Sequence, residues 1–300
     1  MEKVVKSANK EAEQIIEWGE LHKIETCFDR AEKLKPCPIG ETGACCKVCH
    51  MGPCRLVGKN AEEEARGVCG ATLPTVAARN MVRMIAAGTA AHSDHARDMV
   101  LTLLAVANGE VKDFKIKDVK KLYRVAGYLN IEFEGRPVND VAKDVALRFL
   151  DDYSRQKGEI NYTTRAPLKT QERWRKWGIV PRNIDREIAE AMHRTSIGVD
   201  HDPDHLLTHG LRTALADGWG GCMISTDITD ILFGTPMPIK AEASFGIFNE
   251  DEVNLIVHGH EPTLAEIIVD VVTEPEMNLY AKSKGAKGIN LGGMCCTANE

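Results

Sequence analysis

Six cysteines crowd one short segment of the chain and restrict what it can fold into. Five of them lie between residues 37 and 54, and the sixth follows at position 69. A tetrahedral metal site takes four thiolates, so one such site does not use all six. The segment 36–74 is rich in Cys, Gly and Pro and has little periodicity, which predicts a loop wrapped around a cofactor. The six residues are Cys37, Cys45, Cys46, Cys49, Cys54 and Cys69.

The spacing of these cysteines favours an iron-sulfur site over three alternatives. No apolar signal segment opens the chain, so we expect a reducing compartment, where disulfides are rare. A thioredoxin-like pair at Cys46 and Cys49 should open a helix after a strand, and here it sits inside a larger cluster. Structural zinc usually joins two short knuckles across a longer spacer. The uneven run from Cys46 to Cys69 is closer to the ligand runs of iron-sulfur proteins.

The neighbours Cys45 and Cys46 predict that the six thiolates divide between two centres. Adjacent side chains of a non-helical segment point in diverging directions, so these two are expected to bind different centres. If four cysteines complete one site, Cys37 and Cys45 remain as half of another. We predict that this second cluster lies on a two-fold axis and takes its other thiolates from an identical subunit. The four ligands of the first site would be Cys46, Cys49, Cys54 and Cys69.

The bulk composition predicts a globular protein with no nucleic-acid or membrane partner. The 300 residues, 43% of them hydrophobic, suffice for two domains. The net charge of -6 and mixed acidic and basic residues provide no basic face for nucleic acid or lipid. No window approaches the roughly 18 apolar residues of a membrane span. We therefore expect a cytoplasmic location.

The hydrophobic pattern changes near residue 236, from one that is mostly helical to one that includes strand-like apolar runs. Residues 1–235 read as a mostly helical domain that carries the cysteine loop, with one long helix, or a broken pair, over about 73–108. In 236–300, the apolar runs VNLIVHGH and INLGGMCC flank a helical stretch and predict a parallel βαβ unit. The sequence thus predicts an α plus α/β fold.

Histidines and cysteines follow both strands of the predicted βαβ unit. The carboxyl ends of parallel strands meet at one edge of a sheet, where α/β proteins bind ligands. Each of these histidines and cysteines alone would be interpreted as a structural residue. Imidazole and thiolate groups that converge there would form a mixed metal site. The residues at this edge are His258, His260, Cys295 and Cys296.

Several other features are interpreted as structural. The histidines from His201 to His209 recur every four residues beside two aspartates, and we interpret them as solvent-facing residues on a capped helix, not a metal site. Cys222 is interpreted as a buried thiol. Asp217 is interpreted as a turn-stabilising residue, with support of a proton network as the less favoured alternative. The methionines of the long helix are expected in the core. They are Met81, Met84 and Met99.

Five motifs together resemble the nickel-containing carbon monoxide dehydrogenases of anaerobes, and the resemblance covers essentially the whole chain. The motifs are CPIGETGACCKVCHMGPCRL, AAGTAAHSDHARD, GWGGCMISTDITDILFGTP, NLIVHGHEP and KGINLGGMCCTANE. The resemblance implies a homodimer whose helical N-terminal domain precedes Rossmann-like domains. Residues 236–300 would be the first part of a Rossmann-like domain that is incomplete at residue 300.

The same resemblance implies three metal centres. Cys37 and Cys45 match the ligands of a cluster shared between subunits, of 4Fe-4S or 2Fe-2S type. The other four cysteines of the loop match the ligands of a 4Fe-4S cluster within the subunit. His260 matches a ligand to iron in a nickel-iron-sulfur active centre. Cys296 is expected as a further ligand with Cys295 close by, and the reverse assignment stays open.

The activity implied by the resemblance is the reversible oxidation of CO with water to CO2, two protons and two electrons. Electrons would leave through the clusters to a ferredoxin-like carrier, and an acetyl-CoA synthase subunit is a further partner that the family allows. His92 and His95 match the first positions of a proton-conducting histidine series. Its later positions are replaced in this sequence, so we expect an altered proton route. The replacing residues are Asp98, Met99, Leu101 and Thr102.

Members of that family have longer chains, so the remaining thiolates of the nickel centre are expected beyond residue 300. Two alternatives stay open. A hybrid-cluster protein of the hydroxylamine reductase type has a related fold, but its cysteine spacing is tighter. A non-catalytic electron-transfer or assembly protein could keep the cluster loop without a complete active centre.

Overall fold

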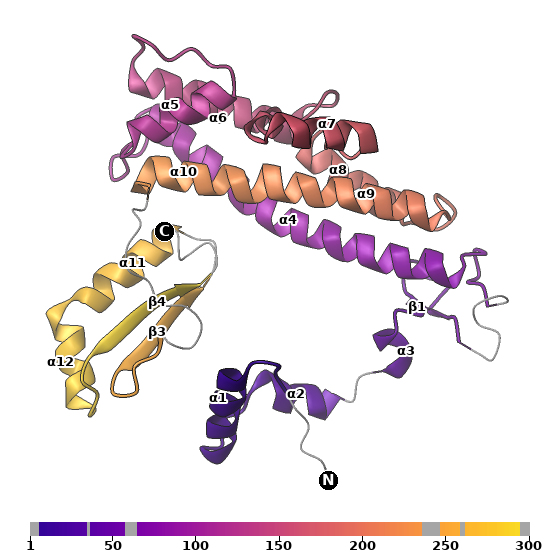
Figure 1. Cartoon of the computed structure of the whole chain (residues 1–300), viewed down its shortest axis with the longest axis horizontal. Coiled ribbons are helices and arrows are strands. Elements are labelled where there is room, and N and C mark those ends of the chain that lie inside the picture. The colour runs from indigo at the N-terminus through magenta and orange to yellow at the C-terminus, as the bar shows by residue number, and fades with distance from the viewer. Residues whose placement is uncertain (1–5, 35–36, 58–64, 236–246, 259–261, 295–300) are drawn as a thin grey trace.

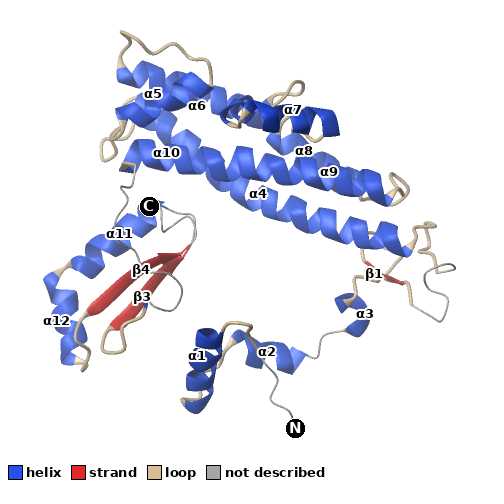
Figure 2. Ribbon diagram, viewed as in Figure 1, coloured by secondary structure: helices blue, strands red, loops and turns tan. Residues whose placement is uncertain are grey.

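The computed structural model describes residues 6–34, 37–57, 65–235, 247–258 and 262–294. Helices dominate, and the described strands are confined to a short hairpin near the cysteine loop and to one parallel pair (Figure 2). The predicted α plus α/β fold is confirmed. The predicted domain boundary at residue 236 begins the segment 236–246, which lies outside the described residues.

The N-terminal segment contains short elements on either side of the first cysteines (Figure 1). Its helices are α1 (Lys10–Leu21), α2 (Cys27–Leu34) and α3 (Pro38–Glu41). The strands β1 (Cys45–Cys46) and β2 (Cys54–Arg55) pair antiparallel. The rest of the described cysteine loop is irregular, as its turn-forming residues predict.

Helix α4 (Leu73–Ala107) is one continuous helix of 35 residues and confirms the prediction of a long helix. The side chain of its N-cap Thr72 accepts a hydrogen bond from the Thr75 amide. Buried residues recur three or four positions apart, so the helix presents a continuous buried stripe that is mostly apolar. Among them are Val82, Ala86, Thr89, Ser93, Ala96, Val100 and Leu103.

Six further helices and two short helical segments follow α4 along the chain, and α6, α8, α9, α10 and η2 pack against it. Helices α9, η2 and α10 follow one another without a break, and Figure 1 shows them running alongside α4. The bounds are α5 (Val119–Tyr128), α6 (Val138–Ser154), η1 (Asn161–Arg165), α7 (Leu168–Trp177), α8 (Ile184–Arg194), α9 (Pro203–Ala216), η2 (Asp217–Cys222) and α10 (Met223–Phe233).

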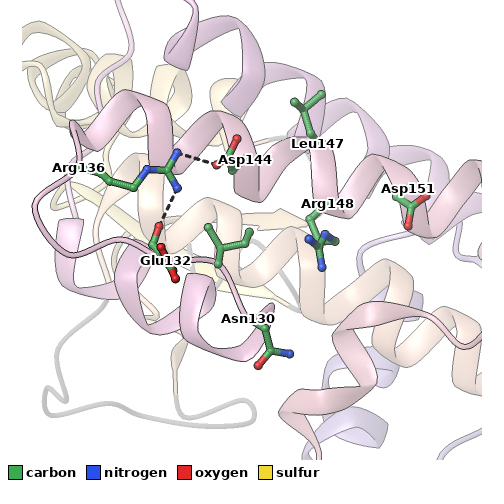
Figure 3. Close-up of a pocket in the computed structure, with 8 residues that line it drawn as sticks. Asn130, Glu132, Arg136, Asp144, Leu147, Arg148 and Asp151 are labelled. Carbon is green, nitrogen blue, oxygen red and sulfur yellow. Dashed lines mark hydrogen bonds and ion pairs between the residues drawn. The ribbon is translucent and has the colours of Figure 1, made fainter.

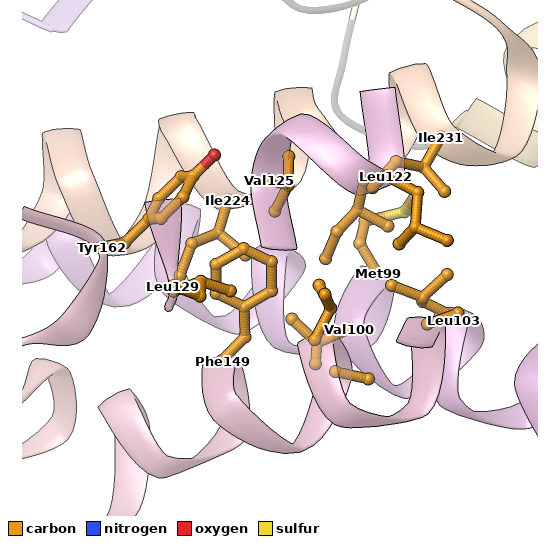
Figure 4. Close-up of a cluster of buried hydrophobic side chains, with 14 of the residues drawn as sticks. Met99, Val100, Leu103, Leu122, Val125, Leu129, Phe149, Tyr162, Ile224 and Ile231 are labelled. Carbon is orange, nitrogen blue, oxygen red and sulfur yellow. The ribbon is translucent and has the colours of Figure 1, made fainter. Parts of the chain in front are cut away.

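The main hydrophobic core fills the space between α4, α5, α6 and α10 (Figure 4). Val100, Leu122 and Phe149 are completely buried in it. The rings of Phe149 and Tyr162 meet edge to face, with their centroids 4.9 Å apart. Burial of this apolar surface is the dominant stabilising contribution to the bundle.

Two buried ionic networks tie helices together at the margins of this core. Lys121 on α5 lies 2.6 Å from each of the carboxylates of Asp227 and Asp230 on α10. On α8, the buried carboxylate of Glu187 accepts hydrogen bonds from the Arg182 Nε at 3.0 Å and the Arg212 Nε at 2.8 Å. Each buried charge therefore faces opposite charge, which offsets the cost of removing it from water.

The C-terminal unit is the predicted βαβ arrangement. Strands β3 (Val253–His258) and β4 (Ile289–Met294) pair in parallel, and α11 (Pro262–Thr273) and α12 (Pro275–Ser283) connect them. His258 is in register with Met294, the last residue of β4. The two strands therefore end at the same edge of the sheet.

Two interpretations from the sequence are wrong in part. His209 does not face solvent: it is buried, and its Nε2–H donates to Glu187 Oε2 at 3.0 Å. Asp202 does cap the start of α9, as predicted. Met99 is buried, whereas Met81 and Met84 are 52% and 68% exposed. No helix in the described ranges is both long and apolar enough to cross a membrane.

The Glu187 network predicts a pH-dependent contribution to stability. Burial opposes the ionisation of Glu187, but the His209 imidazole and the Arg182 guanidinium outweigh burial and hold the pKa of this carboxyl far below its usual value. Because the native pKa lies below the unfolded value of 4.5, the stabilisation is complete above pH 4.5 and is lost as the pH falls below it. Glu187→Gln should lower the free energy of unfolding by about 3 kcal/mol at neutral pH.

Anaerobic urea denaturation at neutral and acidic pH measures this difference. The difference in the free energy of unfolding between wild type and Glu187→Gln should shrink as the pH falls below 4.5, the unfolded pKa of the carboxyl, and a difference independent of pH would contradict the account. Glu159→Gln is the matched control, because Glu159 pairs with Arg175 at 2.7 Å on the surface. Glu159→Gln should lower the free energy of unfolding by less than about 1 kcal/mol.

Candidate metal centre

The short β1–β2 hairpin separates the neighbouring thiols Cys45 and Cys46. Cys46 pairs with Cys54 across the hairpin, and Cys45 pairs with Arg55. Successive side chains of a strand point to opposite faces, so the two thiols leave the chain in opposite directions. Cys46 is 8% exposed, whereas Cys45 is half-buried.

Four cysteines line one largely enclosed cavity between the loop and the start of α4. Val76 and Arg79 of α4 and Ile197 from the segment after α8 also line the cavity. Cys37 and Cys45 are not among the residues that line it. The four cysteines of the cavity are Cys46, Cys49, Cys54 and Cys69.

A glycine allows the loop to fold tightly around this cavity. A Cβ atom on Gly52 would lie 2.9 Å from the Cys54 amide nitrogen and 3.0 Å from the Cys46 carbonyl oxygen. Those distances are too short for a side chain without a shift of the backbone. The tight approach places Cys49 and Cys54 on the same cavity.

Helix α4 holds the loop through Asn80. The Asn80 Nδ2 group donates to the carbonyl oxygens of Gly43 and Cys45, each at 3.1 Å. These bonds satisfy two carbonyl groups of irregular backbone, which would otherwise need water or a secondary-structure partner. The orientation of β1 relative to α4 is therefore fixed just before Cys46.

The surroundings of two thiols favour the thiolate form. Burial opposes the ionisation of Cys69, but the Arg79 guanidinium and nearby backbone amides outweigh burial and lower the pKa of this thiol. The backbone amides of Gly40 and Ile39, at the start of α3, lower the pKa of the exposed Cys37 thiol. Thiolates are the form that binds metals.

The donor set of the cavity fits a soft metal centre. Its described lining contains four thiols and neither a histidine nor a carboxylate. All-thiolate sets are typical of iron-sulfur clusters and structural zinc. None of the eight described cysteines forms a disulfide, so their sulfur atoms are available as ligands.

A second group of possible ligands lies farther along α4. His92 Nδ1 is 2.8 Å from Asp217 Oδ1 and 3.6 Å from Cys222 Sγ. Ligand atoms of the three residues all lie within 4.8 Å of one another. A carboxylate can only accept, so the Nδ1–H of His92 donates to Asp217, which makes Nε2 the nitrogen that accepts a proton. Asp217 and Cys222 open and close the π-helical segment η2.

Gly221 allows η2 to approach α4 this closely, and Gly220 allows it to approach α8. A Cβ atom on Gly221 would lie 3.0 Å from the His92 Cβ, and one on Gly220 would lie 2.4 Å from the Ile184 side chain. The interpretation of Asp217 as a turn residue is wrong, because it lies within continuous helix and contacts His92. Cys222 is half-buried beside His92 and is not an isolated core thiol.

The remaining predicted site residues are placed as follows. His95 is half-buried on α4, about one turn after His92. His258 is the exposed last residue of β3. The other predicted ligands of the βαβ edge follow the last described residues of both strands and lie outside the described residues. They are His260, Cys295 and Cys296.

A separate hollow lies between the end of α5 and α6 (Figure 3). Arg136 pairs there with Asp144 at 2.7 Å and donates to the Glu132 carbonyl oxygen at 2.7 Å. Its described lining offers no thiol and no imidazole. This hollow is therefore not a candidate for the metal chemistry that the cysteines indicate.

The sequence pattern gives little sign of three contacts that His92 and Cys69 make. Asp217 and Cys222 lie 125 and 130 positions from their contact His92, and only the Gly220–Gly221 pair signals that another chain segment comes close. Arg79 sits among alanines on α4, and its distance of ten residues from Cys69 gives no signal that they touch.

The sequence profile of the Prismane/CO dehydrogenase family matches residues 44–300. The chain belongs to this family. It is 50% identical to a protein of Methanosarcina mazei named carbon monoxide dehydrogenase 1, over 98% of this chain and 47% of that protein. The chain thus spans about half the length of the relatives it matches.

Two solved structures of the family show the same architecture. A nickel-free carbon monoxide dehydrogenase from Thermococcus sp. AM4 matches with a TM-score of 0.84 and 45% identity, over 99% of this chain and 48% of that chain. An acetyl-CoA synthase/carbon monoxide dehydrogenase, described with nickel-containing Fe4S4 clusters in its alpha subunits, matches with a TM-score of 0.79 and 40% identity. That match covers 95% of this chain and 42% of the other.

The contact between His92 and η2 predicts that Gly221 tolerates no side chain. Gly221→Ala should lower the free energy of unfolding by about 1–3 kcal/mol, because the added methyl group meets His92 and Asp217 in a packed interface. Gly218→Ala is the matched control in the same segment, since nothing lies within 4 Å of its added Cβ. Urea denaturation of anaerobically purified protein compares the two, and equal midpoints would contradict the proposed close approach.

Proposed function

We propose that the protein containing this chain catalyses the reversible oxidation of CO with water to CO2, two protons and two electrons. The observation that carries the proposal is the four-thiol cavity, in a chain that is 50% identical to a named carbon monoxide dehydrogenase. A redox reaction that releases electrons needs carriers close to the reacting centre, and a buried thiolate set is suited to such a carrier.

The first carrier is a 4Fe-4S cluster in this cavity. The enclosure of the cavity, the uniform sulfur donors and the nearby guanidinium of Arg79 support it. Zinc would fit the same donors but would not transfer electrons. The proposed ligands are Cys46, Cys49, Cys54 and Cys69.

The second carrier is a cluster of 4Fe-4S or 2Fe-2S type, bound by Cys37 and Cys45 together with the same residues of an identical subunit. Cys37 is exposed and Cys45 is half-buried, and neither lines the first cavity. Two thiolates per chain are half of a four-thiolate set, so a two-fold axis would complete the site. The proposed assembly is therefore a homodimer.

The reacting centre is a nickel-iron-sulfur group, to which His260 and Cys296 contribute, with Cys295 close by. When bound, nickel and iron supply a soft site for CO and a Lewis acid that lowers the pKa of water. We propose that the remaining ligands lie beyond residue 300, since the relatives are longer. Residues 236–300 would then begin a Rossmann-like domain, after the helical domain of residues 1–235.

His92 accepts the proton released at this centre. Asp217 holds the ring through Nδ1–H, fixes the tautomer and stabilises the imidazolium that forms when Nε2 takes up a proton. His95 lies about one helical turn farther and is the next proposed acceptor. Electrons pass to a ferredoxin-like carrier, and an acetyl-CoA synthase subunit is a proposed partner in view of the solved relative that contains one.

The test uses the longest natural chain that contains these residues, purified without oxygen. We expect nickel and iron in the protein and CO-dependent reduction of a viologen dye. His92→Ala should lower the rate by roughly 10²–10⁴-fold, the usual contribution of general acid–base catalysis, with metal content unchanged.

His193→Ala is the control, because His193 is an exposed histidine in the last turn of α8. Its rate should equal that of the wild type. Iron-loaded and nickel-reconstituted protein without CO oxidation would overturn the proposal. Full activity without nickel would instead favour a hybrid-cluster protein.

A further inference from the structure

Arg79 is a buried guanidinium that touches the cysteine cavity. It is 1% exposed and lines the same cavity as the four thiols. Its Nη1 donates to the Cys69 Sγ at 3.6 Å, and its Nη2 donates to the Asp200 carbonyl oxygen at 3.3 Å. The side chain is therefore held between the metal-binding loop and the segment that precedes α9.

The charge of Arg79 has an unusual environment compared with the buried Lys121 and the half-buried Arg182. Lys121 faces two carboxylates, and Arg182 faces Glu187 and Glu190. Among the described residues, no carboxylate lies within 4.0 Å of the Arg79 guanidinium. A buried cation without an opposite charge costs several kcal/mol. The anions that the cavity itself offers are thiolates.

We infer that Arg79 compensates the negative charge of the metal-thiolate group in this cavity and raises its reduction potential. The inference rests on the proposed assignment of a 4Fe-4S cluster to the four cysteines. On reduction one electron enters the cluster, no bond forms, and the guanidinium keeps its proton. A fixed cation at hydrogen-bond distance from a ligand sulfur stabilises the added negative charge.

The N-terminal end of α4 adds to the effect of Arg79. The helix begins at Leu73, three residues after Gly70, so its positive N-terminal end also faces the loop that carries Cys69. The bond from Nη2 to the Asp200 carbonyl oxygen fixes the guanidinium in place. A neutral side chain in the same position would remove the contribution of the guanidinium and leave that of the helix end.

The experiment measures the reduction potential of the cluster in the full chain by anaerobic redox titration followed by EPR. In Arg79→Gln, which removes the charge but keeps N–H donors, the ratio of reduced to oxidised cluster at a fixed potential should fall at least tenfold. That change equals 59 mV for a one-electron couple. In Arg79→Lys, which keeps the charge, the ratio should fall less than in Arg79→Gln.

Arg83→Gln is the matched control. Arg83 lies one turn farther along α4 and donates to the Thr195 Oγ1 at 2.8 Å, so its loss removes an equivalent charge away from the thiols. The potential should equal that of the wild type. The other clusters in the same titration provide an internal reference, because they should not shift with Arg79.

Iron content separates a redox effect from a structural one. Arg79→Gln with full iron and an unchanged potential would overturn the inference. Loss of iron to the same extent in Arg79→Gln and Arg79→Lys would also overturn it, because a purely structural role predicts that result. Iron retained in Arg79→Lys and lost in Arg79→Gln would support charge compensation. Wild-type protein without a cluster at these cysteines would instead overturn the proposed assignment, and the inference with it.

Discussion

Helix α4 packs in succession against α9, η2 and α10, and this contact decides where the described candidate ligands lie. Near its start, Arg79 and Asn80 hold the cysteine loop. Farther along, His92 meets η2. With the usual rise of an α-helix, Arg79 and His92 stand about 20 Å apart along the axis. One continuous helix therefore carries residues of both the proposed electron-carrying site and the proposed proton-accepting site.

The way in which buried charges are paired links the fold to the proposed function. In the helical bundle, Glu187 and Lys121 are each surrounded by opposite charges of the protein itself, so these networks are complete without a ligand. Arg79 differs, because its described partners are a thiol and a carbonyl oxygen. A charge that the described protein does not neutralise is suited to a site that is completed by an anionic group.

Local sequence patterns predicted the elements and much of the candidate site. The apolar stripe of α4, the parallel βαβ unit and the opposite directions of Cys45 and Cys46 all follow from residue spacing. Long-range contacts could not be predicted in this way. Asp217 meets His92 across 125 positions, and the burial of His209 depends on the packing of α9 against α4 and α8. Met81 is exposed and Met99 is buried although they lie on the same side of α4, since 18 residues make five turns. The position along the helix therefore decides their burial, and residue spacing does not predict which stretch the other helices cover.

The account depends on a division of the six cysteines between two clusters, with four ligands from Cys46 onward in one cluster and Cys37 and Cys45 in the other. Native mass spectrometry of the anaerobically purified full chain tests it through two neighbouring substitutions. Cys46→Ser should remove the cluster within each subunit, whereas Cys45→Ser should keep that cluster and remove only the one shared by the dimer. If both substitutions removed the same cluster, the division would be contradicted.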